Sequence, residues 1–91
     1  MSAIDKNAAE DLANQLIIQL GLSAGDQFEM LPEETAEVEQ GWVFFFNTID
    51  FVRMKDPVSA LAGNGPIFVS CMGDVSQLPS AIPWKDALGI I

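Results

Sequence analysis

The sequence predicts an α+β fold, in which an N-terminal helix packs on a small, mainly antiparallel sheet and short additional helices complete the domain. Three observations support this prediction: a helical apolar period over residues 2–20, an aromatic run at 42–46, and two short apolar runs around a glycine turn over 67–78. A helix buries one stripe and a sheet buries one face, so such elements pack on one another. The chain has 91 residues and no linker or repeat, which predicts a single domain over 1–91.

The first predicted helix runs from Ser2 to Leu20. An apolar residue recurs at every fourth position along it, the spacing of one helix face: Ile4, Ala8, Leu12, Leu16 and Leu20. Ser2 is expected to cap the start of the helix, and Gly21 to follow its last turn. We interpret the stripe as contact with the core.

The middle of the chain predicts strands. Residues 27–31 have the composition of a strand, which Pro32-Glu33-Glu34 interrupts as a turn, a bulge or an edge. Polar and small residues then alternate over 35–40, with one charged face. After Gly41, the aromatic run Trp42-Val43-Phe44-Phe45-Phe46 predicts one strong strand.

Both faces of that aromatic strand are apolar. Trp42, Phe44 and Phe46 point to one side, and Val43 and Phe45 point to the other. One helix covers one face of a small sheet, so loops of the chain or a partner must cover the second face. Burial within the monomer is the favoured interpretation, and an uncovered face would be a protein interface.

Two further short helices are predicted. Asp56-Pro57 has the residues of a helix start, Ala62 would complete this helix, and Gly63 would end it. Asn64-Gly65 then forms a turn pair. Near the C-terminus, Pro83 is expected to begin a last short helix that runs to Leu88.

A hairpin is predicted between these two helices. Its strands cover 67–72 and 75–78, and Gly73-Asp74 forms the turn between them. Cys71 alternates with the apolar residues of the first strand. We therefore interpret its thiol as buried and inert.

The charge is strongly acidic and unevenly distributed. The chain has 13 acidic and 4 basic residues and a net charge of −9. The stretch between Lys6 and Arg53 contains no base and nine acids, at Glu10, Asp11, Asp26, Glu29, Glu33, Glu34, Glu37, Glu39 and Asp50. Such a field repels nucleic-acid phosphates and anionic lipid, and it steers a basic protein toward it. The alternative is that the acidic surface only keeps the domain soluble.

The expected location is the cytoplasm. A single cysteine cannot form an internal disulfide, no signal peptide is recognisable, and the longest apolar run is far too short to span a bilayer.

Catalytic chemistry is poorly supported. The chain has no histidine and no tyrosine, so Ser-His and Cys-His nucleophile pairs are excluded. No calcium-loop or phosphate-loop motif is present, and we expect no metal and no cofactor. A carboxylate hydrolase built on the glutamates of 33–39 is the remaining enzymatic alternative, although a chain this short leaves little room for a substrate cleft.

Several motifs resemble one bacterial family. Gly41-Trp42 with its aromatic strand is similar to the family's "GW-aromatic-F" strand, and Leu61 to Ile67 resembles its "LAGN(A/G)P-aliphatic" motif. Gly73-Asp74-Val75, followed by Leu78, resembles its hairpin turn. The chain is identified on these residues as a member of the immunity protein 35 family, also called the YrhB domain. The ordered matches cover 41–88, about half of the chain.

The resemblance implies an α+β domain made by bacteria beside polymorphic toxins. Members are expected to bind and neutralise a cognate toxin, often a papain-like peptidase domain, and not to act as enzymes. One branch of the family implies an alternative, a small chaperone-like or general protein-interaction module. The family motif is interpreted as a signature of the fold, carried by Gly41, Trp42, Gly63, Asn64, Gly65 and Pro66.

The partner-binding residues are expected in the acidic stretch and on the aromatic strand: Glu29, Glu33, Glu34, Glu37, Glu39 and Phe45. The carboxylates would pair with basic groups around the toxin's active site, and buried apolar anchors would supply affinity. An open sheet edge or face could also pair two copies into a homodimer.

Overall fold

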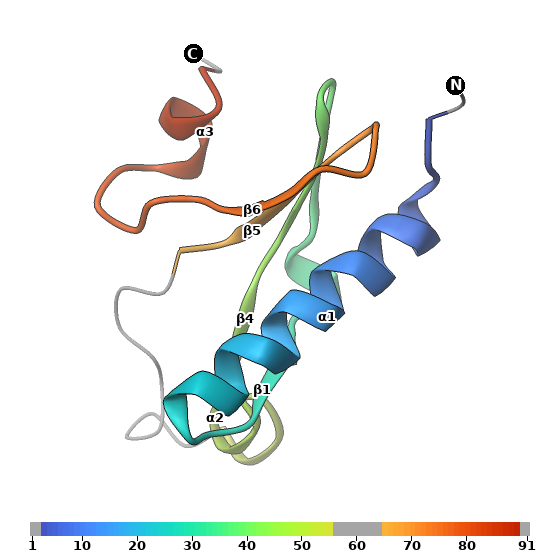
Figure 1. Cartoon of the computed structure of the whole chain (residues 1–91). Coiled ribbons are helices and arrows are strands. Elements are labelled where there is room, and N and C mark those ends of the chain that lie inside the picture. The colour runs from blue at the N-terminus through green and yellow to red at the C-terminus, as the bar shows by residue number, and fades with distance from the viewer. Residues whose placement is uncertain (1–2, 56–64, 90–91) are drawn as a thin grey trace.

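A computed structural model describes residues 3–55 and 65–89. Its elements are α1 (Lys6–Ala24), β1 (Phe28–Met30), the 3-10 helix η1 (Pro32–Glu34), β2 (Ala36–Val38), β3 (Gly41–Phe44), β4 (Phe46–Thr48), α2 (Ile49–Met54), β5 (Ile67–Ser70), β6 (Val75–Gln77) and α3 (Trp84–Ala87). The long helix α1 crosses one side of the strands, and α3 lies on the opposite side (Figure 1). This arrangement confirms the predicted α+β class.

Helix α1 begins and ends later than the sequence indicates. Asp5 is the N-terminal cap, because its side chain accepts a hydrogen bond from the Ala8 amide at 2.8 Å. The helix continues past Gly21 and ends at Gly25, which adopts the left-handed conformation at φ 70°. Gly21 is buried inside the helix, where a Cβ would approach the Asp26 carbonyl oxygen to 2.9 Å. The predicted end at Gly21 is therefore wrong.

The apolar stripe of α1 is also shifted by one position. Its fully buried residues are Ala9, Ala13, Ile17 and Gly21. Most of the predicted stripe flanks them, because Ile4, Leu12, Leu16 and Leu20 are only partly buried against the core. Small side chains along the buried line let the helix approach the strands closely.

The predicted aromatic strand is divided at Phe45. β1 pairs with β4, and β2 pairs with β3, so the chain from β1 to β4 forms one long, bent hairpin. Between the pairs Met30↔Phe46 and Ala36↔Val43, one arm has residues 31–35 and the other only 44–45. Helix η1 takes up the excess residues as a large bulge, and the Leu31 amide donates a hydrogen bond to the Phe45 carbonyl oxygen at 2.8 Å.

The larger sheet has four antiparallel strands in the order β2-β3-β5-β6. The predicted hairpin of β5 and β6 is present, and Ser70 Oγ accepts hydrogen bonds from the Met72 and Asp74 amides in its turn. β5 ends at Ser70, so Cys71 lies in the turn. The expectation of a buried thiol is wrong, since Cys71 is half-buried and its Sγ lies 3.7 Å from the Glu39 carbonyl oxygen.

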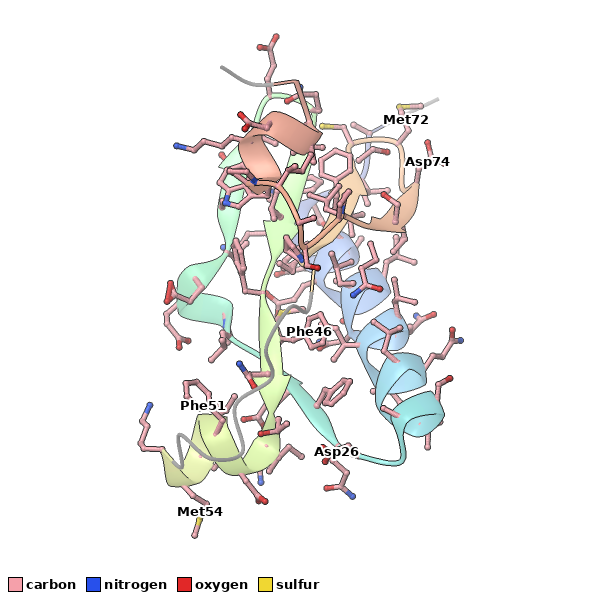
Figure 2. The ribbon with its side chains drawn as sticks, turned by 90° about the vertical axis from the view of Figure 1, so that its left-hand side faces the viewer. Asp26, Phe46, Phe51, Met54, Met72 and Asp74 are labelled. Carbon is pink, nitrogen blue, oxygen red and sulfur yellow. The ribbon has the colours of Figure 1, made fainter. Side chains whose placement is uncertain are left out.

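The core lies between α1 and the strands. Phe44, Ile67 and Val69 are fully buried there, and Trp42 and Phe46 are nearly so. Figure 2 shows the ring of Phe46 between its strand and α1. The position of Trp42 in the core agrees with its interpretation as part of the fold signature.

Two glycines of the family motif lie at close approaches of the backbone. A Cβ on Gly41 would collide with the Val69 carbonyl oxygen, and a Cβ on Gly65 would collide with that of Leu78. The Pro66 carbonyl oxygen accepts a hydrogen bond from the Leu78 amide at 2.8 Å. Gly63, Asn64 and the helix predicted over 56–62 lie outside the described residues.

Helix α2 was not anticipated from the sequence. It begins directly after β4, where Thr48 Oγ1 accepts a hydrogen bond from the Phe51 amide at 3.1 Å. The predicted C-terminal helix is present as α3, which follows Pro83.

Candidate functional site

A groove of about 480 Å³ opens where the long strand divides at Phe45. Its walls come from three places: the η1–β2 segment, the β3–β4 junction and α3. The lining residues are Leu31, Glu34, Ala36, Phe45, Phe46, Asn47 and Trp84. Figure 2 views the molecule from the side of α3 and shows this helix in front of the long strand. We call this feature the Phe45–Trp84 groove.

The residues around the groove show what covers the second face of the aromatic strand. Val43, on that face, is fully buried, whereas Phe45 is half-buried. Trp84 reaches the same groove from α3 and is itself half-buried. The C-terminal part of the chain therefore covers this face in part and leaves aromatic surface accessible beside the bulge.

One charged residue lines the groove, and a second one contacts a lining residue. The Glu34 side chain is exposed on the η1 wall. On the α3 side, Lys85 Nζ lies over the Trp84 ring, 5.6 Å from its centroid, which is a cation–π arrangement. The groove thus combines aromatic surface with a carboxylate at one wall, and the ammonium group of Lys85 lies over the ring of its lining residue Trp84.

The predicted acidic residues do not form one cluster. Only Glu34 joins Phe45 at the groove. Glu37 is exposed on the edge strand β2, and Glu39 is exposed in the turn between β2 and β3. Glu29 and Glu33 line a different groove, of about 530 Å³, between α1, η1 and α2.

Glu29 is the one predicted site residue with an ion pair among residues 3–55 and 65–89. Its Oε1 accepts hydrogen bonds from Arg53 Nη2 at 2.7 Å and Nε at 3.0 Å, which link β1 to α2. These hydrogen bonds, together with the charge of Glu29, raise the pKa of Arg53 above its usual value. Glu29 therefore presents much less net charge to a partner than Glu34 does.

Sequence reasoning missed Trp84, Leu31 and Asn47 as groove residues. Trp84 carried a usable signal, since a large aromatic residue at the start of a short terminal helix must find apolar surface. Leu31 and Asn47 carried no such signal, because their positions depend on the bulge.

No set of metal ligands is assembled in the described part of the chain. None of its helices combines the length and the hydropathy needed to cross a membrane.

The structure is thus a small α+β domain with an aromatic groove beside a bulged hairpin. Comparison with family models places this domain among the immunity proteins, which as a class generally bind a cognate toxin. The model described as "Immunity protein 35" matches residues 5–88, nearly the whole chain. The chain belongs to the immunity protein 35 family. The match includes the N-terminal half, which the motifs after Gly41 did not cover. No curated protein and no solved structure matches the chain.

Proposed function

We propose that this protein binds a cognate toxin and neutralises it by occluding the toxin's active site, in the bacterial cytoplasm. The observation that carries the proposal is the family match over residues 5–88. A papain-like peptidase is the class of toxin that the family resemblance implies.

The surface around the Phe45–Trp84 groove supports this proposal. Specific interfaces place aromatic anchors at their centre and polar groups at the rim. Phe45 and Trp84 supply the aromatic centre, and Glu34 and Glu37 supply acidic groups beside it. Under this proposal, the exposed carboxylates accelerate encounter with a basic toxin surface, and the contacts made inside the groove set the lifetime of the complex.

The direct test is a neutralisation assay with the toxin encoded beside this gene. The purified toxin domain is mixed with increasing amounts of this protein, its activity is recorded, and the mixture is passed over a sizing column. We expect activity to fall to background near one equivalent, with co-elution of the two chains. Full toxin activity at saturating protein, with separate elution, would contradict the proposal.

A chaperone-like role is a second candidate with specific support. Ile18, Leu22, Met54 and Met72 are large apolar residues that are more than half exposed. Such side chains could hold unfolded clients. This function predicts suppressed aggregation of many unrelated proteins at low affinity, whereas immunity predicts one tight partner.

A further inference from the structure

Three apolar or mixed grooves on the surface differ in their charges. The groove beside Glu29 has a carboxylate that Arg53 already pairs. The groove between Ile18, Leu22 and Phe28 is mainly apolar, and nothing shows what would cover it. In the Phe45–Trp84 groove, aromatic rings adjoin the carboxylate of Glu34, which has no ion-pair partner among the described residues.

A long cationic side chain fits this combination. Lysine and arginine bury their apolar stems and keep the charged end near polar groups. Leu31 and Phe45 supply apolar surface for the stem, and Glu34 supplies the opposite charge at the wall. The volume of about 480 Å³ is more than one such side chain needs.

The structure already contains a cation on one of these rings. Lys85 Nζ lies 5.6 Å from the centroid of Trp84. This contact shows that the Trp84 ring can hold a cation against its face. It also makes Lys85 a competitor, since a second positive charge entering the groove would be repelled by it.

The sign of the surrounding charge favours a cation over an anion. The chain carries a net charge of −9, and Glu33 and Glu37 are exposed on the segment that forms the η1–β2 wall. An acidic group of a partner would have to approach through this field to reach Lys85.

We infer that the Phe45–Trp84 groove is a subsite for one arginine or lysine side chain of the partner protein. The identity of the partner rests on the proposed function, whereas the binding chemistry of the subsite does not. The stem of this side chain lies against Leu31 and Phe45. Its charged end lies between Glu34 and the Trp84 ring.

The first experiment uses a small probe and needs no toxin. N-acetyl-arginine amide is titrated into the ¹⁵N-labelled protein, and the amide and indole resonances are followed. We expect saturable shifts at Phe45 and at the Trp84 indole, with weak affinity. The matched probe is N-acetyl-citrulline amide, which has nearly the same shape without the charge, and we expect little shift.

Two variants of opposite effect identify the charges involved. Both side chains are exposed, so neither change should disturb the fold, and unchanged resonances elsewhere verify this. Glu34→Gln should weaken binding of the arginine probe about tenfold, the effect of losing one charge-assisted contact. Lys85→Met should strengthen it about threefold, because the competing cation is removed. Reversed signs, or equal binding of the citrulline probe, would overturn the inference.

The second experiment separates this inference from the proposed function. Glu34→Gln and Asp11→Asn each raise the net charge by one, but Asp11 is exposed on α1, on the other side of the strands. We expect only Glu34→Gln to shorten the lifetime of the toxin complex. Equal effects, together with a silent arginine titration, would remove the subsite and leave neutralisation intact. Arginine binding without any toxin neutralisation would leave the subsite and remove the proposed function.

Discussion

Single residues hold the central strands of this protein at close range. Gly65 lies against the backbone that follows β6, and Gly41 lies against that of β5. Neither position has room for a Cβ, so these two glycines of the family motif have a direct steric role. Trp42, the aromatic residue of that motif, fills the core next to Gly41.

Replacement of Gly65 by alanine should destabilise the protein. The new Cβ would collide with the Leu78 carbonyl oxygen, which belongs to the backbone and cannot rotate away. Forced overpacking of this kind costs about 1–3 kcal/mol of unfolding free energy. Urea denaturation measures the loss. The control is Gly89→Asn, because Gly89 has a positive φ that asparagine tolerates and nothing near its Cβ position. An unchanged midpoint for Gly65→Ala would contradict the steric explanation.

The indole N–H of Trp42 should reduce the stability of the core. Its side chain is 9% exposed, and its Nε1 is buried with no hydrogen-bond partner among the described residues. Trp42→Phe removes this unpaired donor and keeps most of the apolar volume, so we expect a loss below about 1.5 kcal/mol. Trp42→Ala leaves a cavity and should cost about 3–5 kcal/mol. Equal losses in thermal or urea unfolding would show that the indole N–H is satisfied in solution.

The stability of helix α1 depends on its N-terminal cap. Asp5 accepts a hydrogen bond from the Ala8 amide, and no acidic residue occupies the first turn to compensate for its loss. Asp5→Ala should therefore destabilise the protein by about 1 kcal/mol. Asp11→Ala, in the middle of the same helix and exposed, is the control and should change stability little. Urea unfolding followed by circular dichroism compares the two, and a smaller effect for Asp5→Ala than for Asp11→Ala would refute the capping role.

The elements show which parts of a fold are encoded locally. The β5–β6 hairpin and α3 could be predicted, because Gly73-Asp74 and Pro83 act on their immediate neighbours. The division at Phe45 could not, because it depends on how many residues the facing arm contributes. Helix α1 was predicted one turn too short at its C-terminal end, because Gly21 is selected there for close packing and not for a turn.

At the scale of the molecule, the acidic residues are spread over different surfaces. Phe45 was expected as a contact residue, and its aromatic character was sufficient for that hypothesis. The hypothesis that Glu29 to Glu39 act together rested on proximity in sequence. The hairpin bend separates them, and Arg53 pairs with Glu29 from an element that was not predicted.

The charge of the hairpin should control how fast the toxin binds. A variant with Glu33, Glu34, Glu37 and Glu39 changed to Gln should associate more slowly at low salt, and its association rate should depend less on salt. A control with Asp11, Asp26, Asp50 and Asp74 changed to Asn has the same net charge and should retain more of the rate. Stopped-flow association at several salt concentrations measures both. Identical rates for wild type and the glutamine variant at low salt would eliminate steering by these residues.

The bulge at η1 has a consequence for how such proteins diverge. The residue pairs of the hairpin on either side of the bulge are Met30↔Phe46 and Ala36↔Val43. Each pair is fixed by its own ladder of strand hydrogen bonds. Residues can therefore be inserted into or deleted from the segment 31–35 without shifting the register of either strand pair. The same residues form one wall of the groove. If the groove binds the toxin as proposed, a lineage can thus remodel its recognition surface by insertion and deletion while the rest of the fold is inherited unchanged.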